Sequence, residues 1–226
     1  MGSARAMTDR DYLPAAGRAW ALPLYDVVTR LLGFDRARQA ILDHADLRTE
    51  ARVLDIGCGT GSLAVSIKRL HGKVEVVGLD PDPKALARGR RKAEAAGAVV
   101  RFDQGFSDQL PYPDASFDRV FSSLMLHHLT PEEKDRTLSE VRRVLKPGGV
   151  LHLVDFGGPD PGPRGFLAHV LHAGPHLSDN FEGRILARMR QAGFTDPSEV
   201  AHRASPVGRV AYYRASVAVL TVGRTK

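Results

Sequence analysis

The amino-acid sequence predicts a single α/β domain whose mostly parallel sheet of seven strands carries helices on both faces. The first observation is that short apolar runs alternate with helical segments between residues 51 and 155, because strands separated by helices form βαβ units. The second is that these strands are continuously apolar, which is typical of a sheet covered on both faces. The third is a tail of two strands with a short link, which requires an antiparallel closing hairpin.

The composition and length agree with one globular domain. The 226 residues include 43% hydrophobic and 26% charged residues, and no run of 18 apolar residues predicts a transmembrane helix. Residues 1–6 are interpreted as an expression scar, which leaves residues 7–226 as the domain. Its expected parts are an N-terminal helical cap at residues 12–45, a core at 51–155, an insertion at 157–194 and a closing hairpin at 199–222.

Local patterns place each element. The cap is predicted as helices at 18–32, with a roughly helical apolar period, and 35–45. Residues 130–133 (TPEE) form a capping box with proline at N1, so a helix is expected to begin there. The core strands are predicted at residues 51–56, 74–79, 98–102, 117–122 and 150–155, with helices at 60–70, 83–96 and 130–145 and a turn at 146–149. The rest of the chain is predicted as helices at residues 166–172 and 181–192 and strands at 199–204 and 209–222.

The chemistry centres on residues 53–61 (VLDIGCGTG), where a strand runs into a glycine-rich turn that opens a helix. Glycines let the backbone take positive φ and let a ligand approach closely. Nicotinamide and flavin folds share such a turn, but Ser62 stands where a dinucleotide fingerprint places its third glycine. A carboxylate at Asp55 would repel a pyrophosphate and suit a cationic ammonium. The turn therefore favours S-adenosylmethionine, which has an ammonium, a sulfonium and no phosphate.

Asp80 is the second element of the expected site. It ends the second predicted strand, 19 residues after Gly61, where a carboxylate can accept hydrogen bonds from both hydroxyls of an adenosine ribose. The alternative is that Asp80 caps the following helix. We favour the ribose role because the glycine turn and the carboxylate occur together at this spacing.

Residues 53–61 together with Asp80 resemble the cofactor signature of class I S-adenosylmethionine-dependent methyltransferases, a family with a Rossmann-like fold. Residues 105–118 (GFSDQLPYPDASFD), 122–129 (SSLMLHHL) and 140–149 (EVRRVLKPGG) are similar to the subgroup of ubiquinone/menaquinone C-methyltransferases, also called methyltransferase type 11. The resemblance covers about residues 25–155, and it identifies residues 51–155 as the cofactor-binding core and 157–194 as a substrate-side insertion.

The resemblance implies a set of cofactor-binding residues. Asp55 and the glycines would contact the methionine part, Asp80 would hold the ribose and Pro81 would line one face of the adenine. Main-chain carbonyls near Leu124 would receive the ammonium. The full set is Asp55, Gly57, Cys58, Gly59, Gly61, Asp80, Pro81, Ser107, Asp108 and Leu124.

The adenine end departs from the family at one position. Ser107 and Asp108 stand where the backbone and an acidic side chain usually frame the adenine. Relatives often have Asp or Asn before this serine, aimed at the adenine amino group, whereas this chain has Phe106. Asp108 or the backbone would have to replace that contact.

Two histidines are the catalytic candidates. Methyl transfer is an in-line displacement at a sulfonium methyl, so the protein mainly supplies position, which contributes roughly 7–11 kcal/mol in well-held reactants. A base is needed only if the nucleophile must lose a proton. His127 and His128 follow the fourth predicted strand, and an imidazole suits a phenol, enol or alcohol proton. The alternative is that they hold the loop in place.

The substrate residues are expected to be Tyr25, His128, His169 and His172. His169 and His172 share a helical face, but no carboxylate at matching spacing completes a metal site, so none is expected. The lone cysteine, Cys58, excludes a thiolate cluster and an internal disulfide. Together with the lack of a signal sequence, it indicates a cytoplasmic protein.

The leading hypothesis is therefore methylation of a small apolar or aromatic acceptor, with the cap and insertion as a lid. The net charge of +6 prompts an alternative, an RNA or protein methyltransferase, although no appended nucleic-acid module is visible. A non-catalytic S-adenosylmethionine-binding protein is a third alternative. Arsenite methylation requires several thiolates, and the chain has one cysteine. An NAD-dependent oxidoreductase is not favoured, because the Asp55 carboxylate would repel the pyrophosphate of NAD. The acceptor atom and the oligomeric state are not determined by the sequence.

Overall fold

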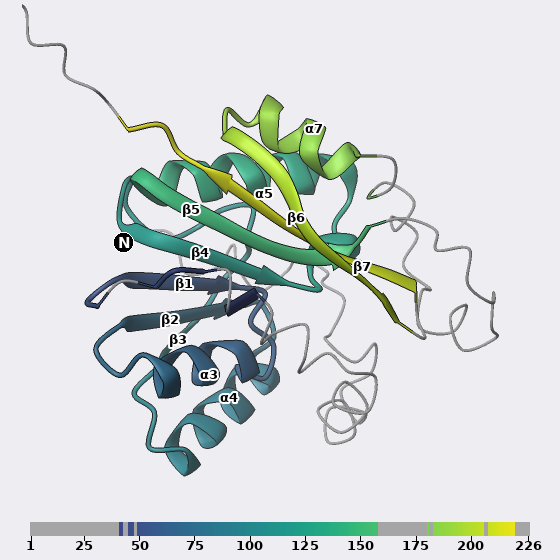
Figure 1. Cartoon of the computed structure of the whole chain (residues 1–226). Helices are drawn as coiled ribbons and strands as arrows, with labels where there is room; N and C mark the ends of the chain where they lie inside the picture. Colours follow the sequence, from purple (N-terminus) through teal and green to yellow (C-terminus); the bar gives the residue numbers. More distant parts are fainter. Residues whose placement is uncertain are drawn as a thin grey trace, which may run out of the picture.

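The computed structural model describes residues 41–42, 45–47, 49–157, 180, 183–205 and 208–219. These residues form a seven-stranded sheet in the order β3-β2-β1-β4-β5-β7-β6 (Figure 1). The strands are β1 (Arg52–Ile56), β2 (Glu75–Asp80), β3 (Arg101–Gln104), β4 (Phe117–Ser123), β5 (Leu145–Phe156), β6 (Thr195–Ser205) and β7 (Gly208–Ser216). Only β7 runs against its neighbours. The predicted mostly parallel sheet with a closing hairpin is confirmed.

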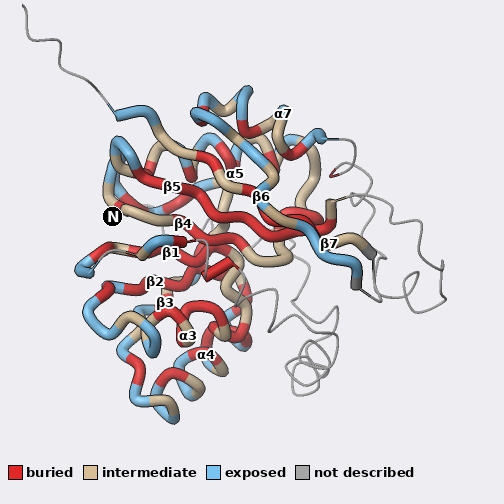
Figure 2. Tube along the Cα trace, in the orientation of Figure 1, coloured by how far each residue is buried: buried red, intermediate tan, exposed pale blue. Residues whose placement is uncertain are grey.

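Helices cover both faces of this sheet. The described helices are α3 (Ser62–Leu70), α4 (Pro83–Ala95), the short 3-10 helix η2 (Leu126–His128), α5 (Pro131–Val144) and α7 (Arg184–Gln191). Leu138 of α5 and Met189 of α7 are buried on one face, whereas Ile67 of α3 is buried on the other. Tyr212 and Tyr213 point to opposite faces, as predicted for neighbours on a strand. The buried residues follow the central strands (Figure 2).

The predicted turn at residues 146–149 is wrong, because these residues form the irregular start of β5. The register shifts between the pair Phe117–Leu145 and the pair Arg119–Val150, which leaves extra residues on β5. The Gly148 N–H donates to the Val217 carbonyl and the Val217 N–H donates to the Gly149 carbonyl, both at 2.9 Å. The backbone groups of the glycine pair are thereby satisfied without a turn that leaves the sheet.

Other boundaries also differ from the prediction. The third strand begins at Arg101 rather than at residue 98, and α3 begins at Ser62 because Gly61 is left-handed. The hairpin spans residues 195–216 rather than 199–222. Pro197 hid the start of β6 in the sequence, since β6 is an edge strand and its register shifts there.

Much of the predicted cap and insertion lies outside the described residues. Of the cap, Ile41 and Leu42 are helical and buried, whereas Ala45 already lies beyond the helix. Tyr25, His169 and His172 all fall outside the described part of the chain. Among the described helices, none has the length and apolar character needed to cross a bilayer.

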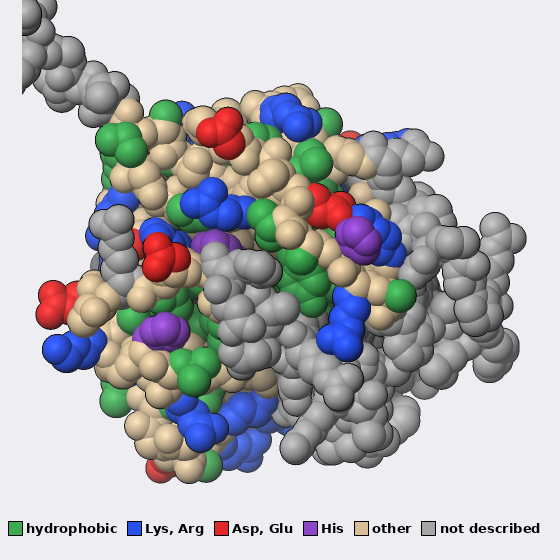
Figure 3. Space-filling model, in the orientation of Figure 1, with side chains coloured by type: hydrophobic (Ala, Val, Ile, Leu, Met, Phe, Trp, Pro, Cys, Tyr) green, Lys and Arg blue, Asp and Glu red, His purple; other side chains and the backbone are tan. Residues whose placement is uncertain are grey.

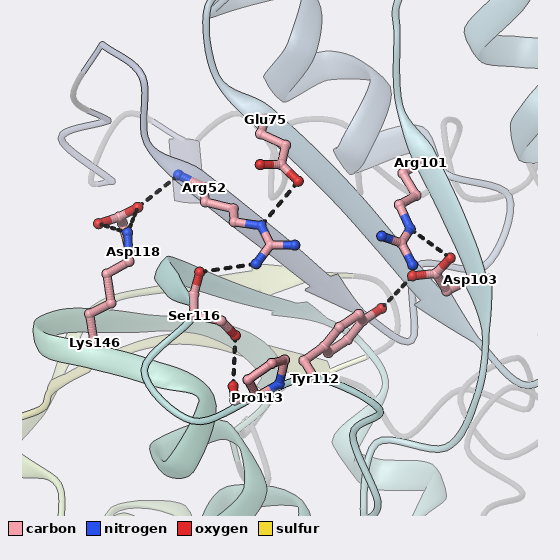
Figure 4. A network of polar contacts seen from close by, with 9 residues as sticks. All are labelled: Arg52, Glu75, Arg101, Asp103, Tyr112, Pro113, Ser116, Asp118 and Lys146. Carbon is pink, nitrogen blue, oxygen red and sulfur yellow. Dashed lines mark hydrogen bonds and ion pairs between the residues drawn. The ribbon is translucent and has the colours of Figure 1, made fainter.

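Charged side chains near the amino-terminal ends of the strands form ion pairs with one another (Figure 4). Arg52 at the start of β1 donates to Glu75 at the start of β2, with Nε 3.0 Å from the carboxylate. Lys146 of β5 donates to both carboxylate oxygens of Asp118 on β4, at 2.9 and 3.0 Å. These side chains bind one another, so the opposite, carboxyl-terminal edge of the sheet is where a ligand site is to be sought.

Candidate functional site

The carboxyl ends of four neighbouring strands carry the candidate residues. The strand order reverses between β1 and β4, and ligands of open α/β sheets bind at such a switch point. In order across the edge stand Asp80 of β2, Asp55 of β1, the segment 124–128 after β4, and Asp155 of β5. The sheet thus brings together residues that are spread over a hundred positions of the chain.

The glycine turn after β1 is left-handed at each of its glycines. Gly57, Gly59 and Gly61 have φ of 62°, 53° and 71°, a region that side chains rarely adopt. The Cys58 N–H donates to the Leu79 carbonyl at 3.0 Å, which ties the turn to β2. A Cβ on Gly57 would stand 2.2 Å from Cγ of Met125. The turn is therefore held between β2 and the segment that follows β4.

Gly61 has a second function that the sequence did not indicate. A Cβ at Gly61, Gly78 or Gly89 would lie 2.7, 3.0 or 2.9 Å from the Phe102 ring. Phe102 is 7% exposed, so three glycines, from the turn before α3, from β2 and from α4, surround one buried ring. These glycines therefore allow α3 and α4 to pack closely against the sheet, in addition to shaping the turn.

Asp80 binds the backbone but keeps capacity for more donors. Its Oδ2 accepts from the Gly59 N–H at 2.8 Å and its Oδ1 from the Asp82 N–H at 2.9 Å. The alternative role as helix cap is wrong, because Asp82 caps α4 by accepting from the Lys84 N–H. Burial raises the pKa of Asp80 to about 6, and the two backbone donors oppose the shift. A carboxylate has about four acceptor positions, which leaves two for vicinal hydroxyls.

Three further residues lie beside Asp80, and Asp55 is the most buried of them. Asp55 is 1% exposed at the end of β1. Burial, followed by the negative charges of Asp55 and Asp80, raises the pKa of Cys58 well above its ordinary value. Its thiol therefore stays protonated at neutral pH. Pro81 accepts a hydrogen bond at its carbonyl from Gln104 Nε2 at 3.1 Å.

The residues expected near the adenine pack against α5. The Ser107 hydroxyl lies 3.0 Å from that of Thr137. Asp108 accepts from Nε and Nη2 of Arg136 at 3.1 and 3.0 Å. An adenine contact at this end would therefore come most directly from the backbone of the 106–108 turn, with Asp108 already bound to an arginine.

The segment after β4 begins with a strained residue. Leu124 has φ of 55°, although it is not glycine, and its N–H still donates to the Val154 carbonyl at 2.8 Å. Positive φ at a residue with a side chain costs roughly 1 kcal/mol or more, and such strain gathers at functional sites. The turn at Leu124 directs η2 across the carboxyl ends of β4 and β5.

His127 and Asp155 form a buried pair at this edge. The His127 ring Nδ1 lies 2.8 Å from Asp155 Oδ1, and the His127 backbone N–H donates to Oδ2 at 3.2 Å. Burial alone would raise the pKa of Asp155, but His127 and the Phe156 N–H prevail and hold it below its ordinary value. Asp155 is therefore ionised at neutral pH.

His128 differs from its neighbour. The two imidazole rings lie 3.9 Å apart between centroids. Packing around its imidazole, followed by repulsion from His127, lowers the pKa of His128, while the residue as a whole is exposed to solvent. His128 is therefore neutral at physiological pH and a weak base.

Asp155 and Asn180 were missed by the sequence reasoning. Asn180 is 1% exposed and its Nδ2 donates to Asp155 Oδ1 at 3.3 Å, while its own Oδ1 has no hydrogen-bond partner in the described part of the chain. The signal for Asp155 was available, since it ends an apolar strand as Asp55 and Asp80 do. Across the described ranges, no three His, Cys, Asp or Glu side chains group as metal ligands.

The comparisons with known proteins decide the family. Residues 53–149 match the model of a methyltransferase domain. A demethylmenaquinone methyltransferase of Thermus thermophilus is 40% identical over 66% of this chain and 68% of its own length. A demethylmenaquinone methyltransferase of Deinococcus radiodurans is 35% identical over 85% of this chain and 83% of its own. The chain belongs to this family of S-adenosylmethionine-dependent methyltransferases.

The solved structures agree on the fold of this methyltransferase. A Haemonchus contortus phosphoethanolamine N-methyltransferase in complex with S-adenosylmethionine has a TM-score of 0.74 at 18% identity, over 96% of this chain and 60% of its own. The predicted Rossmann-like fold and cofactor are confirmed. The residues also fit the cofactor, because a turn of left-handed glycines adjoins Asp80, which retains acceptor positions for two hydroxyls.

Proposed function

We propose that this methyltransferase transfers a methyl group to a ring carbon of a small aromatic quinol, next to a hydroxyl group that loses its proton. The relatives named demethylmenaquinone methyltransferases suggest the acceptor class. The observation that carries the proposal is the order of groups along the carboxyl edge, with Asp80, Asp55 and the His127–Asp155 pair on successive neighbouring strands.

That order matches the parts of the two reactants. Strands in a sheet lie about 4.8 Å apart, so β2 and β5 are separated by about 14 Å. Asp80 would accept from the ribose hydroxyls, and Asp55 with the glycine turn and the carbonyls near Leu124 would hold the charged methionine end. The acceptor would then lie beside β4 and β5, where His127 is. When bound, S-adenosylmethionine supplies an electrophilic methyl on a sulfonium whose thioether leaves as a neutral group.

The chain's own residues would handle the proton of the acceptor. Removal of the proton from a quinol hydroxyl raises the electron density of the neighbouring ring carbon, which forms the new bond to the methyl. The sulfur–methyl bond breaks and its electron pair stays on sulfur. An imidazole is suited to take the hydroxyl proton near neutral pH. The ring regains aromaticity when the hydrogen on the methylated carbon is released to solvent.

The basic charge of the chain does not favour a nucleic-acid substrate in particular. Lys and Arg side chains occupy several separate places on the face drawn in Figure 3, with a group over α3 and α4 at the bottom. Some Lys and Arg side chains of the protein bind its own polar groups, for example Lys92, which donates to the Thr60 and Ser62 hydroxyls. Net charge informs association rather than fold or site.

The proposal is tested by a comparison of acceptors. The purified protein with S-adenosylmethionine would be offered a demethylated naphthoquinol, the same compound kept in its quinone form, a naphthoquinol already methylated at the ring carbon, and a short RNA. We expect adenosylhomocysteine release and a ring-methylated product with the first compound only. Methylation of RNA, or turnover that does not need the reduced acceptor, would contradict the proposal.

A further inference from the structure

Both oxygens of the Asp155 carboxylate bind groups of the protein itself. Oδ1 receives the His127 ring at 2.8 Å, the Phe156 N–H at 2.7 Å and the Asn180 amide at 3.3 Å, and Oδ2 receives the His127 N–H at 3.2 Å. Four donors thus surround Asp155, which is fully buried. The carboxylate therefore acts on groups of the protein rather than on solvent.

The hydrogen bonds that Asp155 accepts determine which nitrogen of the His127 ring carries the proton. Asp155 is fully buried, and backbone N–H groups, which are always donors, reach both of its oxygens. A carboxylate in that setting is an acceptor only, so Nδ1 of His127 must carry the hydrogen of their contact. A neutral imidazole with hydrogen on Nδ1 has its lone pair on Nε2. The backbone N–H of His127 binds the same carboxylate, so the main chain and the ring are oriented together.

We infer that Asp155 is a positioning residue that holds His127 in the Nδ1–H form, so that Nε2 of His127, rather than His128, accepts the proton of the acceptor hydroxyl. The inference rests on the proposed function for its catalytic part. In the step, the hydroxyl proton moves to Nε2, the imidazole becomes a cation, and the Asp155 carboxylate stabilises that charge across the Nδ1 hydrogen bond. The proton leaves to solvent after the methyl has transferred.

His128 is less suited to the same task. Its pKa is lowered, so its ring is a weaker base than an ordinary imidazole. Within the described part of the chain, no carboxylate forms a hydrogen bond with its ring, whereas the His127 ring lies 2.8 Å from Asp155. His128 lies against the His127 ring at 3.9 Å, which limits how far that ring can turn. The adjacent histidines thus divide into a base and a neighbour that packs against it.

The kinetic test compares Asp155→Asn with Asp155→Glu, with Asp114→Asn as the matched control, since Asp114 is 79% exposed at its side chain. An amide cannot stabilise the imidazolium and replaces one acceptor by a donor. We expect Asp155→Asn to lower kcat at least hundredfold, to leave the Kd for S-adenosylmethionine within threefold, and to move the rising limb of the kcat–pH profile to lower pH. Asp155→Glu should restore part of kcat, and Asp114→Asn should behave as the wild type.

The charged and titratable groups near His127 are Asp155 of β5, His128 of η2 and, through Asp155, Tyr213 of β7. Burial raises the pKa of Tyr213 to about 12, so it stays neutral over the pH range of the assay. The limb in the profile would therefore belong to the His127–Asp155 pair. An unchanged pH profile with a lowered kcat would mean that Asp155 only maintains the fold and would overturn the inference.

A second measurement does not require the molecule that receives the methyl group. Two-bond proton–nitrogen spectra of ¹⁵N-histidine-labelled full-length protein distinguish the two neutral imidazole forms, with His127→Gln used for assignment. We expect Nδ1–H for His127 in the wild type and loss of that preference in Asp155→Asn. Observation of the Nε2–H form in the wild type would overturn the inference. If this spectrum is as expected and no quinol is methylated, the proposed function fails and the assignment of Asp155 stands.

Discussion

Asp80 and Asp155 lie near the carboxyl ends of β2 and β5, at the same edge of the sheet. Both are buried, yet their pKa values shift in opposite directions. Asp80 on the β1–β2 side receives two backbone donors, and burial raises its pKa to about 6. Asp155 on the β4–β5 side receives four donors, and despite greater burial its pKa lies below the ordinary value. Burial raises both pKa values, so the interaction of Asp155 with His127 decides the difference in sign.

The difference indicates what each region does. A buried carboxylate with unused acceptor positions is costly to ionise until a ligand supplies the missing donors, which suits Asp80 to a ribose. A carboxylate whose pKa is lowered by its protein partners is ionised at neutral pH and orients its donors, which suits Asp155 to His127. We therefore expect the cofactor to supply the missing donors of Asp80, whereas the protein itself supplies those of Asp155.

The largest expected effect comes from the β4–β5 region. We expect His127→Gln to lower kcat by about a hundredfold to ten-thousandfold, the range that general bases contribute, with the Kd for S-adenosylmethionine nearly unchanged. The check is steady-state kinetics with a naphthoquinol, together with calorimetry of cofactor binding. His71→Gln is the matched control, because His71 lies at the far end of α3. A large loss of cofactor affinity in His127→Gln would remove the separation between the two regions.

The second prediction concerns the packing beneath the β1–β2 region. Gly61→Ala places a Cβ 2.7 Å from the Phe102 ring at φ of 71°, so we expect a loss of about 2–4 kcal/mol in the free energy of unfolding. Gly97→Ala is the matched control, since Gly97 has φ of 60° and nothing within 4 Å of the added atom. It should lose only about 1–2 kcal/mol. Equal losses in urea unfolding would show that Phe102 does not constrain the turn.

These two regions also differ in how well the sequence predicted them. The β1–β2 region was found because Asp55, the glycines and Asp80 lie within one short stretch, where strand ends and turn residues leave a local pattern. The β4–β5 region was found only in part. His127 and Asp155 are 28 positions apart, and their contact depends on the pairing of β4 with β5 and on the strained turn at Leu124.

Two other features were predicted wrongly or missed because they depend on contacts between distant parts of the chain. Residues 146–149 have the composition of a turn, but Val217 satisfies their backbone from another part of the chain. Gly61 was interpreted through the ligand alone, because nothing near it in the sequence indicates that Phe102 packs against it. Long-range contacts of this kind override local preference.

The third prediction tests whether Asp80 is completed by the cofactor. We expect Asp80→Ala to raise the Kd for S-adenosylmethionine at least tenfold, which is about 1.4 kcal/mol, because two ribose hydroxyls would lose their acceptor. Asp82→Ala, which removes only the cap of α4, should cost stability of about 1 kcal/mol and change the Kd far less. Both Kd values come from calorimetry. Unchanged affinity in Asp80→Ala would remove the ribose assignment.

The smallest expected effect is the pH dependence of cofactor binding. Because the pKa of Asp80 is raised to about 6 in the free protein, its carboxylate gains a proton as pH falls through that value, and a protonated oxygen is lost as an acceptor. The Kd for S-adenosylmethionine should therefore be constant above pH 7, roughly twofold higher at pH 6 and severalfold higher at pH 5. The sign is fixed, since the ionised form is the one that accepts from the hydroxyls.

Asp80→Asn provides the control for this pH dependence, because an amide does not titrate in this range. Its Kd should be weaker than that of the wild type at pH 7 and flat down to pH 5. Asp155 offers the contrast, since a carboxylate whose pKa is already lowered stays ionised over the same range and adds no slope. A pH dependence that persists in Asp80→Asn would place the titrating group elsewhere on the edge and would end the distinction between a carboxylate completed by its ligand and one completed by the fold.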